Sequence, residues 1–164
     1  LGRGVMFADS FSSAISVMDT IEAMGEPIFL EEWLPNVGED IRALVVGDRV
    51  VAAMKRIAPK GERRTNIGIG GFAKKIKLSE ELEDLAVRVT KILGMGICGV
   101  DIMETKDGKP YVIEANVNVH FEGITRATKL NIAGMMVEYV KNSYEKKGKH
   151  PFERVVSGIF GGEK

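Results

Sequence analysis

Features that define several specialised protein classes are scarce in this sequence of 164 residues, and each shortage excludes one class. A single cysteine, Cys98, can form neither an internal disulfide nor a cysteine-rich zinc site, and it indicates a reducing compartment such as the cytoplasm. No apolar run approaches the roughly 18 residues that a transmembrane helix needs. Basic and acidic residues number 23 each, so no net charge favours nucleic acid or an anionic membrane as a partner. We therefore expect neither partner.

The remaining composition is that of an ordinary globular protein, with 45% hydrophobic and 28% charged residues. A mass of 17.9 kDa corresponds to one domain. Because the sequence starts with Leu1 and carries no secretion signal, we expect it to be a piece of a longer protein.

Charge is unevenly distributed along this neutral sequence. Residues 1–54 carry a net charge of −6, residues 55–77 carry +7 and residues 78–164 carry −1. The basic block also contains the glycines of residues 68–71. Such a block is either a solvated loop or a mobile cationic loop that closes over an anion such as a polyphosphate, and charge alone favours the solvated loop.

Periodicity and turn residues divide the sequence into helices and strands. Helical spacing of apolar residues predicts helices at residues 10–24, 80–94 and 131–144. The predicted strands are residues 28–34, 41–46, 50–57, 97–104 and 111–117.

Turn residues at 47–48 and 106–109 predict that four of these strands form two hairpins. Residues 58–73 are predicted to be a polar, glycine-rich loop. Because hairpins pair antiparallel strands, we predict an α+β fold in which helices flank an antiparallel sheet.

The second hairpin carries three oxygen-bearing side chains that we predict to lie on one face. Glu114 and Asn116 are two residues apart on one strand, and the tight turn allows Asp101 to pair nearly opposite them. Magnesium prefers such carboxylate and amide oxygens, together with substrate phosphates. The alternative is an exposed sheet face or pairing with basic residues, but three facing donors favour a metal site.

A second group, in residues 31–42, has the character of a nucleotide-binding strand end. The strand-end residues are Glu31, Glu32, Trp33 and Leu34. They can offer backbone groups to an adenine edge and apolar surface to its faces, and Asp40 beyond the turn can hold ribose hydroxyls. The alternative is a strand end with a core Trp33 and a solvated acidic turn, which is the better interpretation without the metal hairpin.

A third group consists of arginines and their neighbours. Arg56 ends the strand at 50–57, and Arg64 and Asn66 lie in the basic loop. Guanidinium groups suit two-point contact with phosphate or carboxylate. Taken singly, each of these arginines is more often a surface residue.

Together these motifs resemble the C-terminal half of RimK-type ATP-grasp ligases, over nearly all of residues 1–150. The most specific parts are the hairpin sequences GVDI and YVIEAN with the EGI and IAGMM that follow. The matching stretches are EEWL at 31–34, GEDIR at 38–42, R-x7-R-x-N at 56–66, GVDIME at 99–104, EAN at 114–116 and EGITRATKLNIAGMM at 122–136. The resemblance implies that residues 1–164 are the C-terminal part of an ATP-grasp domain. The earlier part would lie upstream, and this piece alone would not be a complete enzyme.

The resemblance also implies roles for the matching residues. Glu32 and Trp33, with Glu31 and Leu34 beside them, correspond to the hinge that contacts adenine, and Asp40 corresponds to the ribose-side acid. Arg56 corresponds to an arginine of the reaction centre. The residues that correspond to the loop contacting phosphate and substrate are Arg64, Thr65 and Asn66. The corresponding magnesium ligands are Asp101, Glu114 and Asn116, which would hold two magnesium ions, or manganese in their place.

The chemistry implied by the resemblance is ATP-dependent, ADP-forming ligation of a carboxylate to an amine. The carboxylate attacks the γ-phosphorus of ATP to give an acylphosphate, and the amine then displaces phosphate through a tetrahedral intermediate. We expect a homo-oligomeric enzyme that adds glutamate to a carboxyl acceptor, which is either a protein C-terminus or a small coenzyme.

One stretch departs from the family pattern. Residues 117–121 read VNVHF where RimK-type enzymes usually have a short Ser-Pro-Gly run. Because that stretch lines the acceptor side in the family, Asn118 and His120 become the acceptor-side candidates. Two alternatives stay open: an amino-acid-carrier ligase of the lysine and arginine biosynthesis type, and a non-catalytic nucleotide-binding domain.

Overall fold

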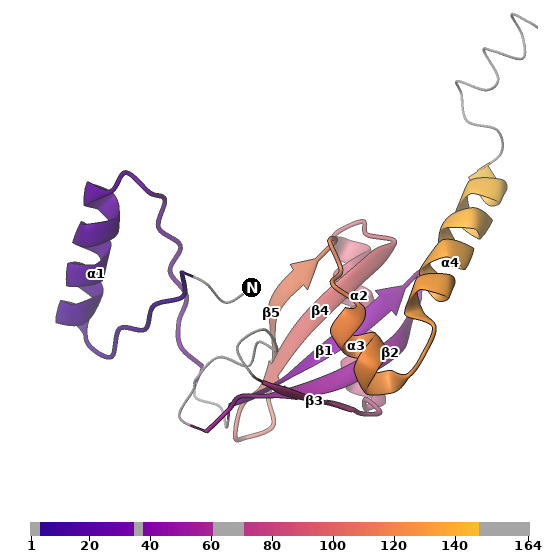
Figure 1. Ribbon diagram of the computed structural model, residues 1–164, viewed down its shortest axis with the longest axis horizontal. Helices are drawn as coiled ribbons and strands as arrows, with labels where there is room; N and C mark the ends of the chain where they lie inside the picture. Colours follow the sequence, from indigo (N-terminus) through magenta and orange to yellow (C-terminus); the bar gives the residue numbers. More distant parts are fainter. Residues whose placement is uncertain (1–3, 35–37, 61–70, 148–164) are drawn as a thin grey trace, which may run out of the picture.

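The computed structural model describes residues 4–34, 38–60 and 71–147 (Figure 1). Its helices are α1 (Phe11–Ala23), α2 (Glu80–Ile92), α3 (Glu122–Thr128) and α4 (Ile132–Lys147). Its strands are β1 (Glu39–Val46), β2 (Arg49–Ile57), β3 (Phe72–Lys75), β4 (Ile97–Glu104) and β5 (Pro110–Asn116). None of the helices in the described residues has the length and apolar character needed to cross a membrane.

The five strands form one sheet in the order β3-β2-β1-β4-β5, and every neighbouring pair is antiparallel. This sheet with its flanking helices confirms the predicted α+β fold. Both predicted hairpins are present as the pairs β1–β2 and β4–β5. Gly47 and Gly108 in their turns have φ angles of 70° and 79°, a conformation that glycine adopts without steric cost.

Alternate residues of the strands supply two separate cores, one on each face of the sheet. In β1, residues 41, 43 and 45 pack on the side of α2, whereas residues 44 and 46 pack on the side of α3 and α4. Figure 1 shows α3 crossing in front of the sheet and α4 running along one end of it. Because both faces are covered, strands β1 and β4 are mostly buried.

The helix ends follow the start and stop signals in the sequence. Ser10 and Ser13 form a capping box at the start of α1, in which each side chain bonds the other residue's backbone N–H. Ser79 caps α2, which has three acids in its first turn and Lys91 in its last, as the helix dipole favours. These caps confirm the two predicted helices to within two residues at each end.

The predicted strand at residues 28–34 is wrong for this structure. The segment is assigned no strand, and Phe29 is 84% exposed. A strand needs a neighbour to take its backbone hydrogen bonds, and no described strand pairs with this segment. Figure 1 shows α1 and the segment after it standing apart from the sheet, and α1 has no buried residue.

Two short elements escaped the sequence prediction. β3 falls partly in the predicted loop, because it is an edge strand of four residues with two lysines and no alternating apolar pattern. α3 has no side-chain cap at its start and lasts only seven residues, so it carries no recognisable start signal. It ends at Lys129, whose φ of 60° is left-handed.

Candidate functional site

Two arginines and two aspartates form a buried cluster on the sheet face that also bears α3. Asp40 and Arg42 lie two residues apart on β1, so their side chains share one face. The register places Arg56 of β2 opposite Asp40, and Asp101 of β4 opposite Arg42. Sheet pairing therefore brings four charges from three strands together, and we refer to Asp40, Arg42, Arg56 and Asp101 as the charge cluster.

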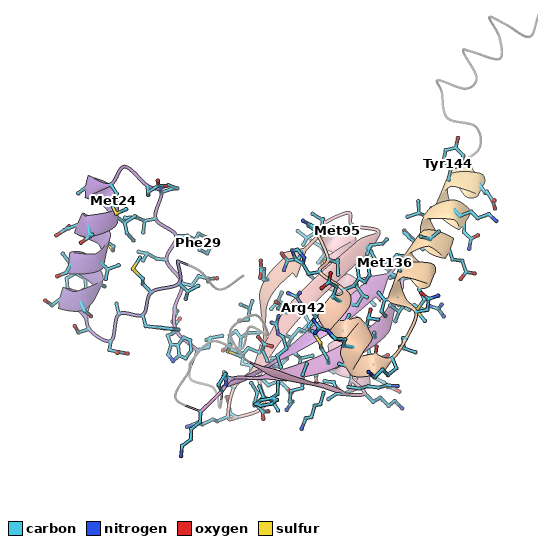
Figure 2. All side chains as sticks on the ribbon, in the orientation of Figure 1. Met24, Phe29, Arg42, Met95, Met136 and Tyr144 are labelled. Atoms are coloured by element: carbon cyan, nitrogen blue, oxygen red, sulfur yellow. The ribbon has the colours of Figure 1, made fainter. Side chains whose placement is uncertain are left out.

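Arg42 binds Asp101 through two parallel hydrogen bonds. Its Nε donates to Oδ1 at 2.6 Å and its Nη2 donates to Oδ2 at 2.7 Å. The Arg42 side chain is 12% exposed and that of Asp101 is 6% exposed. Two-point guanidinium–carboxylate contacts of this kind fix orientation as well as charge. Figure 2 labels Arg42 on the sheet, close to α3.

Arg56 joins the two aspartates of the cluster. Its Nε and Nη2 donate to the two Asp40 oxygens, each at 2.6 Å, and its Nη2 also lies 2.9 Å from Oδ2 of Asp101. Burial by itself lowers the pKa of the Arg56 guanidinium, but the hydrogen bond to Asp40 and the charge of Asp101 outweigh it. The pKa of Arg56 is therefore raised above its usual value, and the group stays charged.

The three predicted metal ligands share this face of the sheet. Asp101 pairs directly with Glu114 across β4 and β5, and Asn116 lies opposite Gly99, two residues along each strand. Directly opposed residues have Cβ atoms about 5 Å apart. Glu114 is exposed and Asn116 is half-buried, whereas Asp101 is buried. Two carboxylates and an amide thus adjoin one another at the edge of the charge cluster.

The chemistry of this donor set fits a hard divalent cation. Magnesium takes carboxylate and amide oxygens, and it usually needs only one or two protein carboxylates beside phosphate oxygens. Within residues 4–34, 38–60 and 71–147, no group of three or more His, Cys, Asp or Glu side chains could hold a metal by itself. A metal here would therefore depend on the Asn116 amide and on oxygens from a substrate.

The predicted adenine-side residues lie in the segment that stands apart from the sheet. Glu31, Glu32 and Trp33 are exposed and Leu34 is half-buried. The Trp33 ring packs edge-on against Phe7, with ring centroids 5.0 Å apart at an interplanar angle of 89°. The structure does not bring these residues against the charge cluster, although Asp40 belongs to it.

The other predicted residues fall in two places. Asn118 and His120 are exposed on either side of the buried Val119, between β5 and α3. Arg64, Thr65 and Asn66 lie outside the described residues.

Sequence reasoning missed Arg42 as a member of the site. Its signal was present, because Arg42 follows Asp40 at the two-residue spacing of one strand face. Its partner Asp101 lies 59 residues away, so only the β1–β4 pairing reveals the contact.

One groove of the described surface lies away from this site. It has a volume of about 560 Å³ and runs between the β1–β2 turn and α4, lined by Gly47, Arg49, Met135 and Tyr139 among others. This turn is at the opposite end of β1 from Asp40. The groove therefore contributes nothing to the charge cluster or the predicted metal ligands.

Comparisons with known proteins show which family the chain belongs to. The family model described as RimK-like ATP-grasp domain matches residues 1–140. A probable alpha-L-glutamate ligase of Legionella pneumophila (strain Corby) is 42% identical over 149 residues, which cover 90% of this chain and 48% of that protein. A probable alpha-L-glutamate ligase of Vibrio vulnificus (strain YJ016) is 39% identical over 154 residues, which cover 90% and 51%.

Solved structures give the same fold. The D-alanine–D-alanine ligase of Bacillus anthracis complexed with ATP matches with a TM-score of 0.64 and 16% identity, over 85% of this chain and 50% of that one. The ATP-grasp ligase PsnB, complexed with a phosphomimetic variant of a minimal precursor, Mg and ADP, matches with a TM-score of 0.54 and 26% identity. That match covers 66% of this chain and 33% of PsnB.

The antiparallel sheet and these likenesses define an ATP-grasp fold. Within that class, the chain belongs to the RimK-like ATP-grasp family, because the family model matches residues 1–140. The chain spans about half the length of the curated relatives it matches.

Proposed function

We propose that the protein is an ATP-dependent, ADP-forming carboxylate–amine ligase that joins glutamate, or a similar amino acid, to a carboxyl acceptor. The observation that carries the proposal is the single sheet face on which Asp101, Glu114 and Asn116 adjoin the charge cluster. The relatives named as probable alpha-L-glutamate ligases support glutamate as the amine substrate. PsnB, solved with Mg and ADP, supports the metal and the nucleotide.

Asp101, Glu114 and Asn116 are the residues that would hold magnesium. Magnesium, when bound, would neutralise the phosphate charge of ATP and so favour attack by the carboxylate substrate. Glu114 is exposed and reaches solvent, whereas Asp101 is buried and already oriented by two arginines. The site would therefore combine one accessible ligand with one rigid ligand.

Arg56 is the cation that we propose for the reaction centre. Its contacts with Asp40 and Asp101 fix the plane of the guanidinium, and its raised pKa keeps it charged. A cation held rigidly stabilises developing negative charge on an acylphosphate without reorganising during the reaction. Asp40, in this proposal, acts by positioning Arg56 rather than by contacting ribose.

Arg56→Lys tests that role because it keeps the charge and loses the planar two-point contact. In the full-length protein we expect turnover to fall by about 2–4 kcal/mol in activation free energy, with nucleotide affinity largely kept. If Arg56 only supports the fold, turnover stays near wild type and the loss appears in the melting temperature.

Asn118 and His120 are proposed to contact the carboxyl acceptor. Both are exposed, and the buried Val119 between them anchors the stretch to the α3-side core. In the full-length protein, His120→Ala should raise KM for the acceptor while leaving KM for ATP unchanged. An equal rise in both values would contradict an acceptor-side position.

The proposed activity is tested by measuring ADP release from the full-length protein with ATP, glutamate and a library of carboxylates. The proposal expects ADP release that requires both glutamate and one class of carboxylate, and that is abolished by Glu114→Gln. Nucleotide binding without ADP release under any combination would indicate a non-catalytic domain instead.

A further inference from the structure

Arg42 differs from the other arginine of the charge cluster in how its hydrogen bonds are divided. Arg56 shares its donors between Asp40 and Asp101, whereas among the described residues the Arg42 side chain donates to Asp101 only. Arg42 also lies directly opposite Asp101 in the β1–β4 register. Its position is therefore fixed by the two central strands of the sheet.

We propose that Arg42 is a positioning residue, which holds the Asp101 carboxylate in the one orientation that suits a divalent cation. This inference rests on the proposed function, because it takes Asp101 as a metal ligand. Two parallel N–H···O bonds, at 2.6 and 2.7 Å, restrain both rotation and tilt of the carboxylate. Groups that orient a ligand in this way typically change metal affinity 10–100-fold when they are removed.

The contacts also distinguish the two oxygens of Asp101. Among the described residues, Oδ2 lies within 2.9 Å of two guanidinium nitrogens, one from Arg42 and one from Arg56. Within the same described part of the chain, Oδ1 accepts a hydrogen bond from Arg42 Nε alone. A carboxylate has about four acceptor positions, two on each oxygen, so Oδ1 is the oxygen with capacity left for an ion.

Charge compensation is the alternative role for Arg42, because the charge cluster pairs two arginines with two aspartates. Arg56 already places one positive charge beside Asp101. A second cation next to a metal ligand repels the incoming ion, so a purely electrostatic role would make Arg42 a competitor of the metal. If Arg42 positions Asp101, replacing Arg42 should weaken metal binding. If Arg42 only competes with the metal, replacing it by an uncharged residue should strengthen metal binding.

The test is titration of the ADP complex of the full-length protein with Mn²⁺, followed by the electron paramagnetic resonance signal of the unbound ion. Arg42→Lys keeps the charge and removes the two-point contact, and Arg42→Met removes both. We expect the Mn²⁺ dissociation constant to rise about tenfold or more in both variants. An unchanged constant in Arg42→Lys, or a lower constant in Arg42→Met, would overturn the positioning role.

Two control variants keep the outcomes separate. Asp101→Asn reports on the metal site itself: if Mn²⁺ binding to the wild type does not depend on Asp101, the proposed metal site fails and the inference fails with it. Lys55→Met removes an ion pair between β2 and β1 on the opposite face of the sheet, in which Lys55 Nζ lies 2.7 Å from Glu39 Oε2, and it should leave the constant unchanged. If Arg42→Met does not fold, the result for Arg42→Lys decides.

Discussion

Strand β4 and residues 28–34 contain similar mixtures of apolar and acidic residues, yet their surroundings are opposite. β4 reads ICGVDIME and is mostly buried, whereas residues 28–34 read IFLEEWL and are exposed apart from the half-buried Leu34. β4 has β1 on one side and β5 on the other, and residues 28–34 have no described strand beside them. The difference shows that strand formation here depends on neighbouring strands more than on local composition.

The same comparison applies to charge. Asp101 in β4 is buried but bound by two arginines, and Glu31 and Glu32 are exposed to water. A buried charge is costly unless it is paired and hydrogen-bonded. Acids of the two regions should therefore respond very differently to replacement.

Removing the Asp101 carboxylate should cause the largest loss. Asp101→Ala removes the carboxylate that binds Arg42 at two points, and it removes one of the two carboxylates beside Arg56 in the buried cluster. We expect the free energy of unfolding to fall by about 3–5 kcal/mol, as for other broken buried pairs. Urea unfolding without added metal measures this free energy. The matched control is Glu32→Ala, at an exposed position, and its free energy of unfolding should stay within about 0.5 kcal/mol of wild type. Equal losses of unfolding free energy in Asp101→Ala and Glu32→Ala would contradict the difference between buried and exposed acids.

Apolar replacements sharpen the same comparison between the sheet and residues 28–34. Leu44 is fully buried between the sheet and the α3–α4 side, whereas Phe29 is 84% exposed. Leu44→Ala should lower the free energy of unfolding of these 164 residues by about 2–5 kcal/mol through lost burial and a cavity. Phe29→Ala should stay within about 0.5 kcal/mol of wild type. A large loss for Phe29→Ala would show that residues 4–34 have a partner within this chain.

The contact between α4 and the sheet gives a smaller effect. A Cβ at Gly96 would lie 2.7 Å from the Tyr139 hydroxyl oxygen, and one at Gly47 would lie 2.9 Å from the same ring. Because the ring is held between the two glycines, Gly96→Ala should lower the free energy of unfolding by about 1–3 kcal/mol. The double variant with Tyr139→Ala should lose less than the sum of the single variants. If the losses of the two single variants simply added up in the double variant, Gly96 and Tyr139 would not be in contact.

The smallest effect is expected for the ion pair on the α2 face. Lys55 Nζ lies 2.7 Å from Glu39 Oε2, and both side chains are more than a quarter exposed. Lys55→Gln should cost only about 0.2–1 kcal/mol, since water already solvates both charges. Thermal unfolding at low and high salt checks this, because a pair of this kind weakens further as salt is added. If Lys55→Gln lost as much unfolding free energy as Asp101→Ala, the ion pair on the α2 face would matter as much as the buried charge cluster, which would contradict this ranking.

Local patterns predicted much of this fold from the sequence. Apolar alternation, the Gly-Asp turn and the Ser79 cap identified β1, β2 and α2 to within two residues at each end. The same alternation placed Glu114 and Asn116 on one strand face and Asp101 opposite them, as the register confirms. These features depend on residues close in sequence, which is why they could be read directly.

Long-range pairing limited the rest. The prediction described Arg56 as a strand-end cation, but its two-point contact with Asp40 depends on the register of β1 against β2. Arg42 was passed over because its partner lies in β4. The strand prediction for residues 28–34 failed for the same reason. Residues with a high propensity for strands cannot show whether a neighbouring strand exists.

The claim that Asp101, Glu114 and Asn116 form a metal site is tested most directly by calorimetric titration of Mg²⁺ into the full-length protein with ADP present. Glu114 is the informative residue because it is exposed, so Glu114→Gln should leave the melting temperature unchanged. The proposed site predicts Mg²⁺ binding in the wild type that weakens about tenfold or more in Glu114→Gln. Equal Mg²⁺ affinity in the two proteins, with ADP bound to both, would contradict it.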